Sequence, residues 1–253
     1  MKIEVTPKLR QNLTVSEALK WSKLPTLEAE MLLAHNLDLP RIALLTHPEN
    51  MVNPADLIKF QNLVVRRKNN EPISYIVGFK DFYGLKIKTD QRALIPRIET
   101  EDLVEEALKL NPRTVADLGT GSGAVALALA SALPNVKIYA TDISAEALEL
   151  AQENAALLGF SNRITFLQGH LTNPLPELVD LITANLPYVR NWMIDELPRE
   201  IKDYEPRVAL DGGDNGLILY NELFATAQDK LRKNGYILYE LDGRIYFRQP
   251  QVS

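Results

Sequence analysis

A glycine-rich segment in the middle of the chain carries the residue types of a ligand-binding turn, Asp117-Leu118-Gly119-Thr120-Gly121-Ser122-Gly123. Its glycines let the backbone turn sharply and let a ligand approach without a Cβ in the way. The Ala-rich helix expected behind them favours a negative group at its N-terminus. Asp142 ends the next predicted strand, where a carboxylate can hydrogen-bond ribose hydroxyls. We expect the ligand to contact Asp117, Gly119, Thr120, Gly121, Ser122, Gly123 and Asp142.

Two classes of ligand fit this loop. The spacing of Gly119, Gly121 and Ala124 satisfies the dinucleotide fingerprint, so the loop alone suits a nicotinamide dinucleotide as well as S-adenosylmethionine. Asp117 precedes the first glycine, where its charge opposes a pyrophosphate but suits a ligand with an ammonium and a sulfonium. A glycine turn that only serves helix–strand packing is the structural alternative. The charge of Asp117 favours S-adenosylmethionine.

A second motif, Asn185-Leu186-Pro187-Tyr188, follows a later apolar stretch. The side-chain oxygen of Asn185 and the backbone carbonyl of Leu186 are candidate acceptors for an NH2 group whose lone pair is delocalised. Pro187 biases Leu186 away from helical geometry, and Tyr188 can lie flat against a planar group. A plain turn after a strand is the alternative interpretation. After a glycine loop, the motif predicts methyl transfer to a planar amide or amino nitrogen, accelerated by positioning.

Alternating strands and helices are expected to position both motifs. The rhythm after Asn111 predicts parallel strands with helices on both faces, a sheet that binds ligands beyond the carboxyl ends of its strands. The predicted strands span 115–118, 138–141, 164–167, 181–184 and 237–240, and the predicted helices span 124–133, 145–158 and 217–231. The residues that follow the strands are Gly119, Asp142, Gln168 to His170, Asn185 and Glu240.

The chain before this sheet has a different pattern. Residues 1–72 predict short helices, because Thr14 and Glu17 have capping-box spacing and Asn53-Pro54 is a typical helix start. Residues 73–92 alternate aromatic and β-branched side chains around glycines and predict a β-hairpin connector. Thr100 is expected to cap the helix that opens the third region, residues 93–253.

The bulk composition limits the function further. A net charge of −5 argues against a protein that neutralises many phosphates. The absence of cysteine excludes thiolate chemistry, and with three scattered histidines we expect no metal site. The N-terminus lacks a signal-peptide core, and no apolar run is long enough to span a bilayer. We therefore expect a monomeric cytoplasmic protein with no membrane partner and no direct binding to nucleic acid.

Taken together, the motifs resemble the HemK/PrmC family of peptide chain release factor glutamine methyltransferases over most of residues 1–240. They are the segment 94–101, the glycine loop, the Asn185–Tyr188 motif, and Glu205-Pro206 followed by 209–217. The resemblance implies S-adenosylmethionine as cofactor and the glutamine of the release factor Gly-Gly-Gln loop as substrate. It implies an α/β fold with a Rossmann-like, seven-stranded class I methyltransferase sheet, a β-hairpin connector and a small all-helical N-terminal domain that helps to dock the substrate.

The resemblance also assigns roles to individual residues. The cofactor glycines map onto 119–123, the ribose-binding acid onto Asp142, and the catalytic and substrate-binding motif onto Asn185, Leu186, Pro187 and Tyr188. Asn185 is expected to contact the cofactor as well. His170 and Leu171 stand where the family has a Gly-Asp-Leu segment near the adenine, so His170 is expected either at the adenine edge or as a solvated surface residue. Arg97 is expected to hold a substrate carbonyl or cofactor carboxylate, or to pair with Glu99 or Glu101.

The chain departs from the family pattern at several positions. Leu186 and Ile98 replace prolines, and Asn215 stands where an aspartate is common. The residues after Glu240 are too few for the helix and strand pair that the family has there. We expect an incomplete sheet with an exposed edge strand, or a truncated or frameshifted sequence.

Other functions fit the same residues. A ribosomal protein could supply the glutamine, since the Asn185 motif does not distinguish the two protein substrates. Amino methylation of nucleic acid is disfavoured by the acidic balance. The short C-terminus also fits a copy that binds the cofactor without activity.

Overall fold

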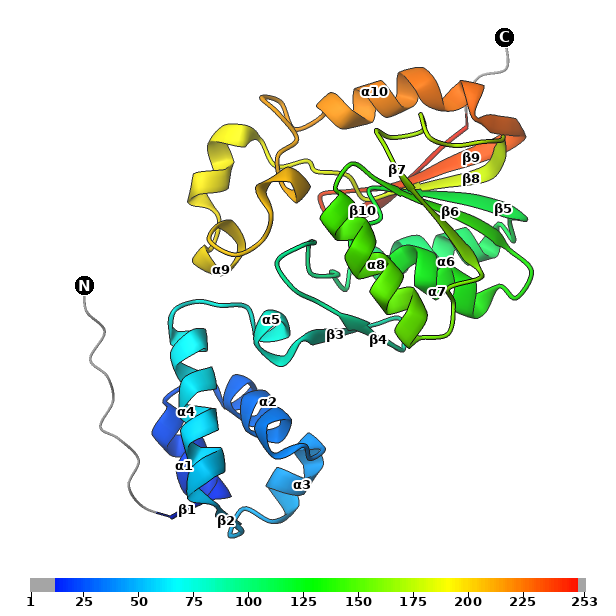
Figure 1. The fold of residues 1–253 in the computed structure, drawn as a ribbon. Helices are drawn as coiled ribbons and strands as arrows, with labels where there is room; N and C mark the ends of the chain where they lie inside the picture. The colour runs from blue at the N-terminus through cyan, green and yellow to red at the C-terminus, as the bar shows by residue number, and fades with distance from the viewer. Residues whose placement is uncertain (1–11, 250–253) are drawn as a thin grey trace. The chain divides into compact units, whose positions relative to one another are not determined.

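The computed structural model describes residues 12–249 of the chain. The chain divides into two compact units, with the boundary between Val77 and Gly78 (Figure 1). Residues 1–11, which are part of the segment considered for a signal peptide, lie outside the described residues. Residues 250–253, the end of the C-terminal tail, lie outside them as well. No helix within residues 12–249 is long and apolar enough to cross a membrane.

The first unit consists of short helices and one small strand pair. Its elements are β1 (Leu13–Thr14), α1 (Val15–Ser22), α2 (Thr26–Leu37), α3 (Arg41–Thr46), β2 (Met51–Val52), α4 (Pro54–Lys68) and α5 (Ile73–Val77). The predicted capping box is confirmed, because Thr14 Oγ1 accepts from Glu17 N at 3.2 Å and Glu17 Oε2 accepts from Thr14 N at 2.8 Å. Asn53 caps α4 and Pro54 is its first residue, as predicted.

The helix α2 is the centre of this unit, and it packs against α1, α3, α4 and α5. Leu32 and Leu33 of α2 and Phe60 of α4 are fully buried. The ring of Trp21 lies 6.4 Å from the ring of Phe60, measured between centroids. These side chains give the first unit a hydrophobic core of its own.

Residues 73–77, which the sequence pattern assigns to the hairpin connector, form the helix α5 instead. The amides of Tyr75 and Ile76 donate to the carbonyl of Pro72, each at 3.0 Å. Tyr75, Ile76 and Val77 are consecutive and all buried. A short apolar run fits a buried helical turn as well as a strand, so periodicity could not separate the two.

The hairpin itself begins at the start of the second unit, with β3 (Phe79–Phe82) antiparallel to β4 (Leu85–Lys88). The turn residues Tyr83 and Gly84 both have positive φ, 47° and 74°. Such a pair matches the right-handed twist of the strands it joins. Phe82 and Ile87 are buried in the main hydrophobic cluster, so the hairpin is part of the core of this unit.

The second unit is built around one sheet, which has six strands within residues 12–249, in the order β10-β9-β8-β5-β6-β7. Its strands are β5 (Thr114–Leu118), β6 (Lys137–Asp142), β7 (Ile164–Gln168), β8 (Val179–Ala184), β9 (Leu231–Leu241) and β10 (Arg244–Arg248). Its α-helices are α6 (Thr100–Lys109), α7 (Ala124–Ala132), α8 (Ala145–Leu157), α9 (Arg199–Lys202) and α10 (Ile218–Thr226). Short 3-10 turns are η1 (Asn191–Glu196), η2 (Arg207–Ala209) and η3 (Ala227–Asp229). The predicted α/β fold with parallel strands is confirmed.

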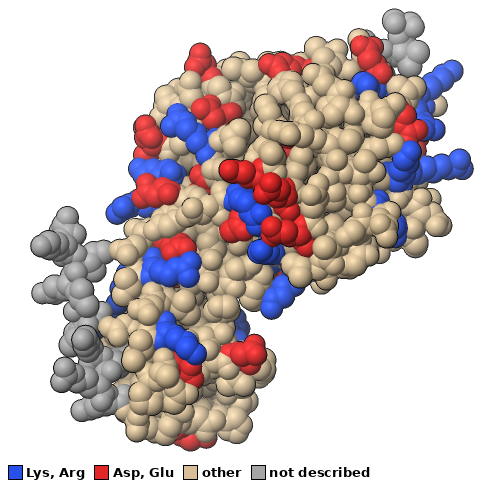
Figure 2. All heavy atoms as spheres, in the orientation of Figure 1, with Lys and Arg blue, Asp and Glu red and all other residues tan. Residues whose placement is uncertain are grey.

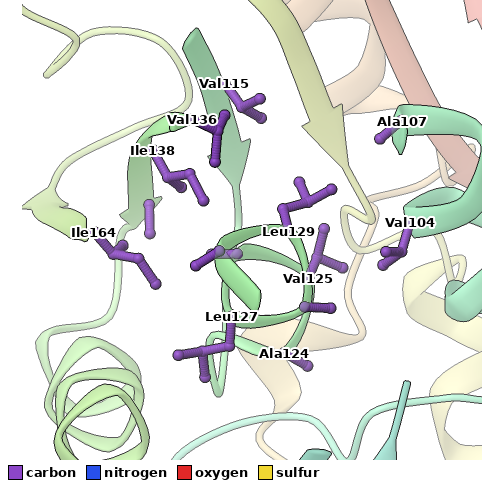
Figure 3. Packing of buried hydrophobic residues seen from close by; sticks show 14 of the residues in the cluster. Val104, Ala107, Val115, Ala124, Val125, Leu127, Leu129, Val136, Ile138 and Ile164 are labelled. Carbon is purple, nitrogen blue, oxygen red and sulfur yellow. The ribbon is translucent and has the colours of Figure 1, made fainter. Parts of the chain in front are cut away.

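Each central strand sends alternate side chains into two different cores. On one face, Val115 packs with α6 and α7, and Figure 3 shows this cluster around Leu129 and Ile138. On the other face, Ala116 packs with residues of α10, among them Tyr220. The covering of both faces explains why every residue of β5 is buried.

The order of strands reverses between β5 and β8. From β5 the chain proceeds outward to β6 and β7, and then returns to place β8 on the other side of β5. A crevice forms at such a switch point, beyond the carboxyl ends of the two strands. The glycine loop follows β5 and Asn185 follows β8, so both predicted motifs are at this crevice.

The tail after β9 reverses at Asp242 and Gly243, which have positive φ values of 52° and 69°. It then runs antiparallel to β9 as β10, one of the two edge strands of the sheet. Phe247 on β10 is 53% exposed. The expected exposed edge strand is therefore present, and it is β10.

Candidate active site

A cavity of about 640 Å³ lies at the carboxyl ends of the central strands. Pockets of this size hold cofactors and small ligands. Its wall includes the segments 92–97, 119–122, 142–144, 169–171, 185–187, 206–209 and 211–213, together with Thr100, Asp117 and Ile218. The two predicted motifs, which are separated by more than sixty residues, therefore form one site.

Backbone hydrogen bonds tie the glycine loop to the end of β6. Thr120 N donates to Thr141 O at 2.9 Å, and Gly121 N donates to Asp142 Oδ2 at 2.9 Å. Gly119 has φ +64°, and a Cβ on it would lie 3.1 Å from Leu186 Cδ2. The loop is thus fixed in place, and Leu186 of the Asn185–Tyr188 motif packs directly against its first glycine.

Gly123 has a different place from the other predicted cofactor glycines. It precedes the first residue of α7 with φ +82°, and a Cβ there would lie 3.1 Å from the Cβ of Ala151 on α8. The cavity wall includes 119–122 but does not include Gly123. Its smallness therefore serves the close packing of two helices.

Asp117 is buried at the end of β5 and lines the cavity. Its carboxylate accepts from Thr120 Oγ1 at 2.6 Å and from Thr183 Oγ1 at 2.9 Å. Burial raises the pKa of Asp117 to about 6, although the two hydroxyls act in the opposite direction. Near neutral pH the floor of the cavity therefore carries a negative charge, which suits a cationic ligand.

Asp142 lies at the end of β6 with both carboxylate oxygens engaged by backbone amides. Oδ1 accepts from Ser144 N and Oδ2 accepts from Gly121 N, each at 2.9 Å. Burial raises the pKa of Asp142, while these amides lower it. A carboxylate has about four acceptor positions, so Asp142 retains capacity for ligand hydroxyls.

The side chain of Asn185 is held by two partners from distant parts of the chain. Nδ2 donates to Thr100 Oγ1 and to Glu240 Oε2, each at 3.0 Å. Thr100 and Glu240 are both buried. Burial raises the pKa of Glu240, and a hydrogen bond from the Thr100 hydroxyl lowers it. Among the described residues Oδ1 of Asn185 has no hydrogen-bond donor, and Asn185 lines the cavity.

This arrangement corrects the prediction for Thr100. The residue before α6 is Glu99, and no side chain caps the helix. The hydroxyl of Thr100 is used for Asn185 instead, 85 residues away in the sequence. A threonine next to acidic residues at a helix start is typical of a cap, so local sequence could not reveal this partner.

The next two residues of the motif are packed against the interior. Leu186 is buried, its amide donates to Tyr220 Oη at 3.1 Å, and its carbonyl accepts from Tyr220 Oη at 3.2 Å. The Tyr220 hydroxyl also donates to the carbonyl of Glu240. Leu186 and Pro187 are part of the cavity wall. The structure thus adds Tyr220, which the sequence analysis did not identify, as the support of the motif.

Tyr188 is placed differently from the other residues of its motif. It is half-buried, packs against the core on the α10 face, and is not part of the cavity wall. Burial raises the pKa of its hydroxyl. The structure therefore brings Asn185, Leu186 and Pro187 to the cavity and does not bring Tyr188 to it.

A glycine-containing loop supports the motif from behind. Val189 N donates to Leu210 O at 3.0 Å, and Gly212 N donates to Val189 O at 2.8 Å. A Cβ on Gly212 would lie 2.7 Å from the Cα of Tyr188. The segment 209–217, one of the motifs of the family resemblance, therefore packs behind the Asn185–Tyr188 motif.

Arg97 pairs with Glu205, which belongs to one of the motifs of the family resemblance. Its Nη2 lies 2.6 Å from Glu205 Oε1, whereas the predicted alternative partners were Glu99 and Glu101. Glu101 instead accepts from Tyr83 N at 2.9 Å. The Glu205 carboxylate is buried, and burial raises its pKa while Arg97 lowers it. Arg97 lines the cavity, so the pair fixes one part of the wall.

His170 and Leu171 follow β7 and both line the cavity. His170 is exposed at the rim, with Nε2 2.6 Å from Glu222 Oε2. Leu171 is buried, with a positive φ of 47°. Sequence analysis missed Ile143 and Ser144 of the same wall, although their position directly after Asp142 was a usable signal. In the described part of the chain, no group of three His, Asp or Glu residues could hold a metal ion.

Comparisons with known proteins agree with this geometry. Residues 14–78 match the PrmC N-terminal domain family, and residues 111–240 match a methyltransferase domain family. The chain is similar to the release factor glutamine methyltransferase of Moorella thermoacetica, with 43% identity over 86% of this chain and 78% of that one. It is 40% identical to the enzyme of that name from Geobacter sulfurreducens, over 85% of this chain and 76% of that one.

Among solved structures, the chain is similar to a ribosomal protein L11 methylase from Lactobacillus delbrueckii subsp. bulgaricus. The two share 26% sequence identity over 60% of this chain and 65% of that one, with a TM-score of 0.42.

Proposed function

The chain belongs to the release factor glutamine methyltransferase family, and from that premise we propose that its cavity methylates the glutamine side-chain amide in the Gly-Gly-Gln loop of a peptide chain release factor. The sheet has the class I methyltransferase fold, and S-adenosylmethionine is the cofactor. The observation that carries the proposal is the Asn185 side chain, whose NH2 group is held by two acceptors while its oxygen is left for the cavity.

The lining of the cavity fits this cofactor. Asp117 would pair with its ammonium group, Asp142 would accept from its ribose hydroxyls, and Ile143 and Leu171 would give apolar contacts to its adenine. The lack of a side chain on Gly119 lets the glycine loop lie directly against Leu186. When bound, S-adenosylmethionine supplies an electrophilic methyl group on a sulfonium.

The motif prepares the nitrogen of the substrate. Asn185 Oδ1 accepts one amide hydrogen of the glutamine, and the Leu186 carbonyl accepts the other. The hydroxyl of Tyr220 has only one proton, for which the carbonyls of Glu240 and Leu186 compete, so the Leu186 carbonyl retains acceptor capacity. Both acceptors orient the NH2 group and favour a pyramidal nitrogen.

The loop then fixes the nitrogen for in-line attack. Pro187 fixes the backbone next to Leu186, and Gly212 packs behind it. Holding the reacting atoms roughly 3–3.5 Å apart replaces a bimolecular encounter by a positioned one. After methyl transfer the cationic nitrogen would release its proton to water, so no side chain has to act as a strong base.

We further propose that the chain acts as a monomer, in the cytoplasm, on protein and not on nucleic acid. The net charge of −5 supports the last point. On the face shown in Figure 2, basic and acidic side chains are interspersed without a broad basic area. Size-exclusion chromatography with light scattering tests the oligomeric state, and a salt titration with labelled RNA tests the nucleic acid.

The decisive experiment combines the purified chain, S-adenosylmethionine and a bacterial release factor, followed by mass spectrometry of the Gly-Gly-Gln peptide. We expect one added methyl group on the glutamine. Asn185→Ala should lower kcat by on the order of 100-fold, with a Kd for S-adenosylmethionine close to that of the wild type by calorimetry. A chain that binds the cofactor but leaves the release factor unmodified, while methylating a ribosomal protein glutamine, contradicts the proposal.

A further inference from the structure

Thr100 and Glu240 both accept hydrogen bonds from the side chain of Asn185, and this fixes the orientation of the Asn185 amide. Glu240 is a buried carboxylate near the end of β9, and an ionised carboxylate can only accept hydrogen bonds. The hydroxyl of Thr100 has one proton, which is donated to Glu240, so its oxygen faces Asn185 as an acceptor. Only the NH2 group of Asn185 satisfies both partners at 3.0 Å.

The opposite orientation of the amide is strongly disfavoured. Rotation by half a turn would bring Oδ1 against the oxygens of Glu240 and Thr100, so that acceptors face each other without a proton. Buried groups that lose their hydrogen bonds in this way are costly. The cavity side of Asn185 is therefore an oxygen and not an NH2 group.

From this closed set of hydrogen bonds we infer that Glu240 and Thr100 are positioning residues that make the site select an amide over a carboxylate. The inference rests on the proposed function, in which Asn185 Oδ1 receives the NH2 group of the substrate. A glutamate side chain in the same place has no hydrogen to donate, and its charge faces the oxygen of Asn185. Thr100 and Glu240, which are 85 and 55 positions from Asn185 in the sequence, thus determine that Asn185 presents a hydrogen-bond acceptor to the cavity.

The first test changes one partner without changing its shape. In Glu240→Gln the new amide can donate to Asn185 Oδ1, which favours the rotated orientation. With saturating S-adenosylmethionine and intact release factor, we expect kcat to fall about 10- to 100-fold, while the KM for the cofactor stays within about twofold. An unchanged kcat overturns the inference and leaves the proposed function intact.

A matched control lies at the opposite end of the sheet, near the start of β8. Asp180 on β8 accepts from the amides of Arg113 and Thr114 at 3.0 and 2.9 Å, far from the carboxyl ends of the strands. Asp180→Asn makes the same carboxylate-to-amide change there and should leave kcat unchanged. An equal loss of kcat in both variants would mean that the effect is structural, which contradicts a positioning role for Glu240.

The preference for glutamine over glutamate is the measurement that would not change if Glu240 had only a structural role. The probes are the release factor and a variant of it in which glutamate replaces the glutamine of Gly-Gly-Gln. The wild-type chain should bind the glutamine form about tenfold more tightly, measured by calorimetry with S-adenosylhomocysteine present. In Glu240→Gln the ratio should fall toward one, because the rotated Asn185 can donate to a carboxylate. An unchanged ratio overturns the inference.

Thr100 gives a second variant in case Glu240→Gln does not fold. Thr100→Val removes the hydroxyl and keeps the branched shape, so kcat and selectivity should both fall, while Thr100→Ser should restore most of both. A Val variant with wild-type selectivity contradicts the role of the hydroxyl.

An NMR measurement that needs no methyl transfer tests the inference independently of the proposed function. The side-chain NH2 signal of Asn185 is assigned in NMR spectra by its loss in Asn185→Asp, and its hydrogen exchange with solvent is compared between wild type and Glu240→Gln. We expect exchange to be about tenfold slower in the wild type. Equal exchange rates overturn the inference, whether or not the release factor is methylated.

Discussion

Nη2 of Arg97 lies 2.6 Å from Oε1 of Glu205, and this pair joins two segments that are 108 residues apart in the sequence. Glu205 Oε2 also accepts from Ile95 N at 3.3 Å. One buried carboxylate therefore holds both the backbone and a side chain of the segment 92–97, which forms part of the cavity wall. Several expected properties of the protein depend on contacts of this kind.

Removal of the cation from this pair is expected to destabilise the protein. Arg97→Met leaves Glu205 buried without its partner, and the free energy of unfolding should fall by about 2 kcal/mol, less than for a fully buried pair because Arg97 is one-third exposed. Urea denaturation at neutral pH measures this. Arg199→Met, which breaks the exposed pair with Asp203, should cause no measurable change, and equal losses would contradict the expectation.

The glycine loop offers a matched pair of substitutions. Gly119→Ala places a side chain at φ +64° with its Cβ 3.1 Å from Leu186 Cδ2, whereas Gly159→Ala has similar strain at φ +79° with nothing within 4 Å. Each should lose about 1 kcal/mol from backbone strain, with a further loss for Gly119→Ala. Calorimetry should show weaker S-adenosylmethionine binding only in Gly119→Ala. Equal affinities in the two variants would mean that the loop does not bind the cofactor.

Asp117 predicts a specific pH dependence of stability. Burial raises its pKa from 3.8 to about 6, so between these values the folded protein keeps a proton that the unfolded chain has released. The contribution of Asp117 to the free energy of unfolding therefore falls as pH rises through this window, by on the order of 3 kcal/mol. The difference between wild type and Asp117→Asn, measured by denaturation from pH 4 to 7, should show this slope. A difference independent of pH contradicts it.

The same titration should affect cofactor binding in the opposite direction. Ionised Asp117 attracts a cationic ligand, so the affinity for S-adenosylmethionine should increase as pH rises through about 6. Calorimetry at pH 5 and pH 7 tests this. Asp117→Asn should bind S-adenosylmethionine weakly at both pH values. If the wild-type affinity is equal at both pH values, a group other than Asp117 binds the ammonium of the cofactor.

Leu186 and Tyr220 are expected to be energetically coupled. Tyr220→Phe leaves the Leu186 amide and the Glu240 carbonyl without their partner and should cost about 2 kcal/mol. In Leu186→Pro the amide hydrogen is already absent, so the same change should cost about 1 kcal/mol less. A double-mutant cycle in urea gives the coupling, with Tyr246→Phe on the edge strand as control. Strict additivity would mean that the Leu186–Tyr220 bond contributes nothing.

Much of the site was predictable because it depends on local patterns. Apolar stretches followed by Gly119, Asp142 and Asn185 predicted strands and the residues at their ends, and parallel strands bring their carboxyl ends together. The predicted helix over 217–231 is α10, which ends at Thr226 and continues into a 3-10 turn. These features follow from periodicity and strand order alone.

The contacts that support the site were not predictable, because they do not depend on local sequence patterns. The partners of Asn185 and Arg97 come from segments that the sheet topology brings together, and no local spacing marks them. Thr100 has the local sequence of a helix cap, and nothing in the sequence around Glu205 indicates a contact with Arg97. Tyr188 shares the motif of Asn185, yet it packs against the α10 face, because loop backbone direction decides where a side chain goes.

The order of the strands has a consequence for how the site forms during folding. Asp117 and Asp142 belong to neighbouring strands joined by one helix, so the part of the site around the glycine loop needs only a short chain closure. Asn185 gains its orientation only after Glu240 has joined the sheet beside β8, and Glu240 belongs to the last parallel strand among residues 12–249. We therefore expect the part of the site around Asn185 to form after the part around the glycine loop, because it needs the longer chain closure.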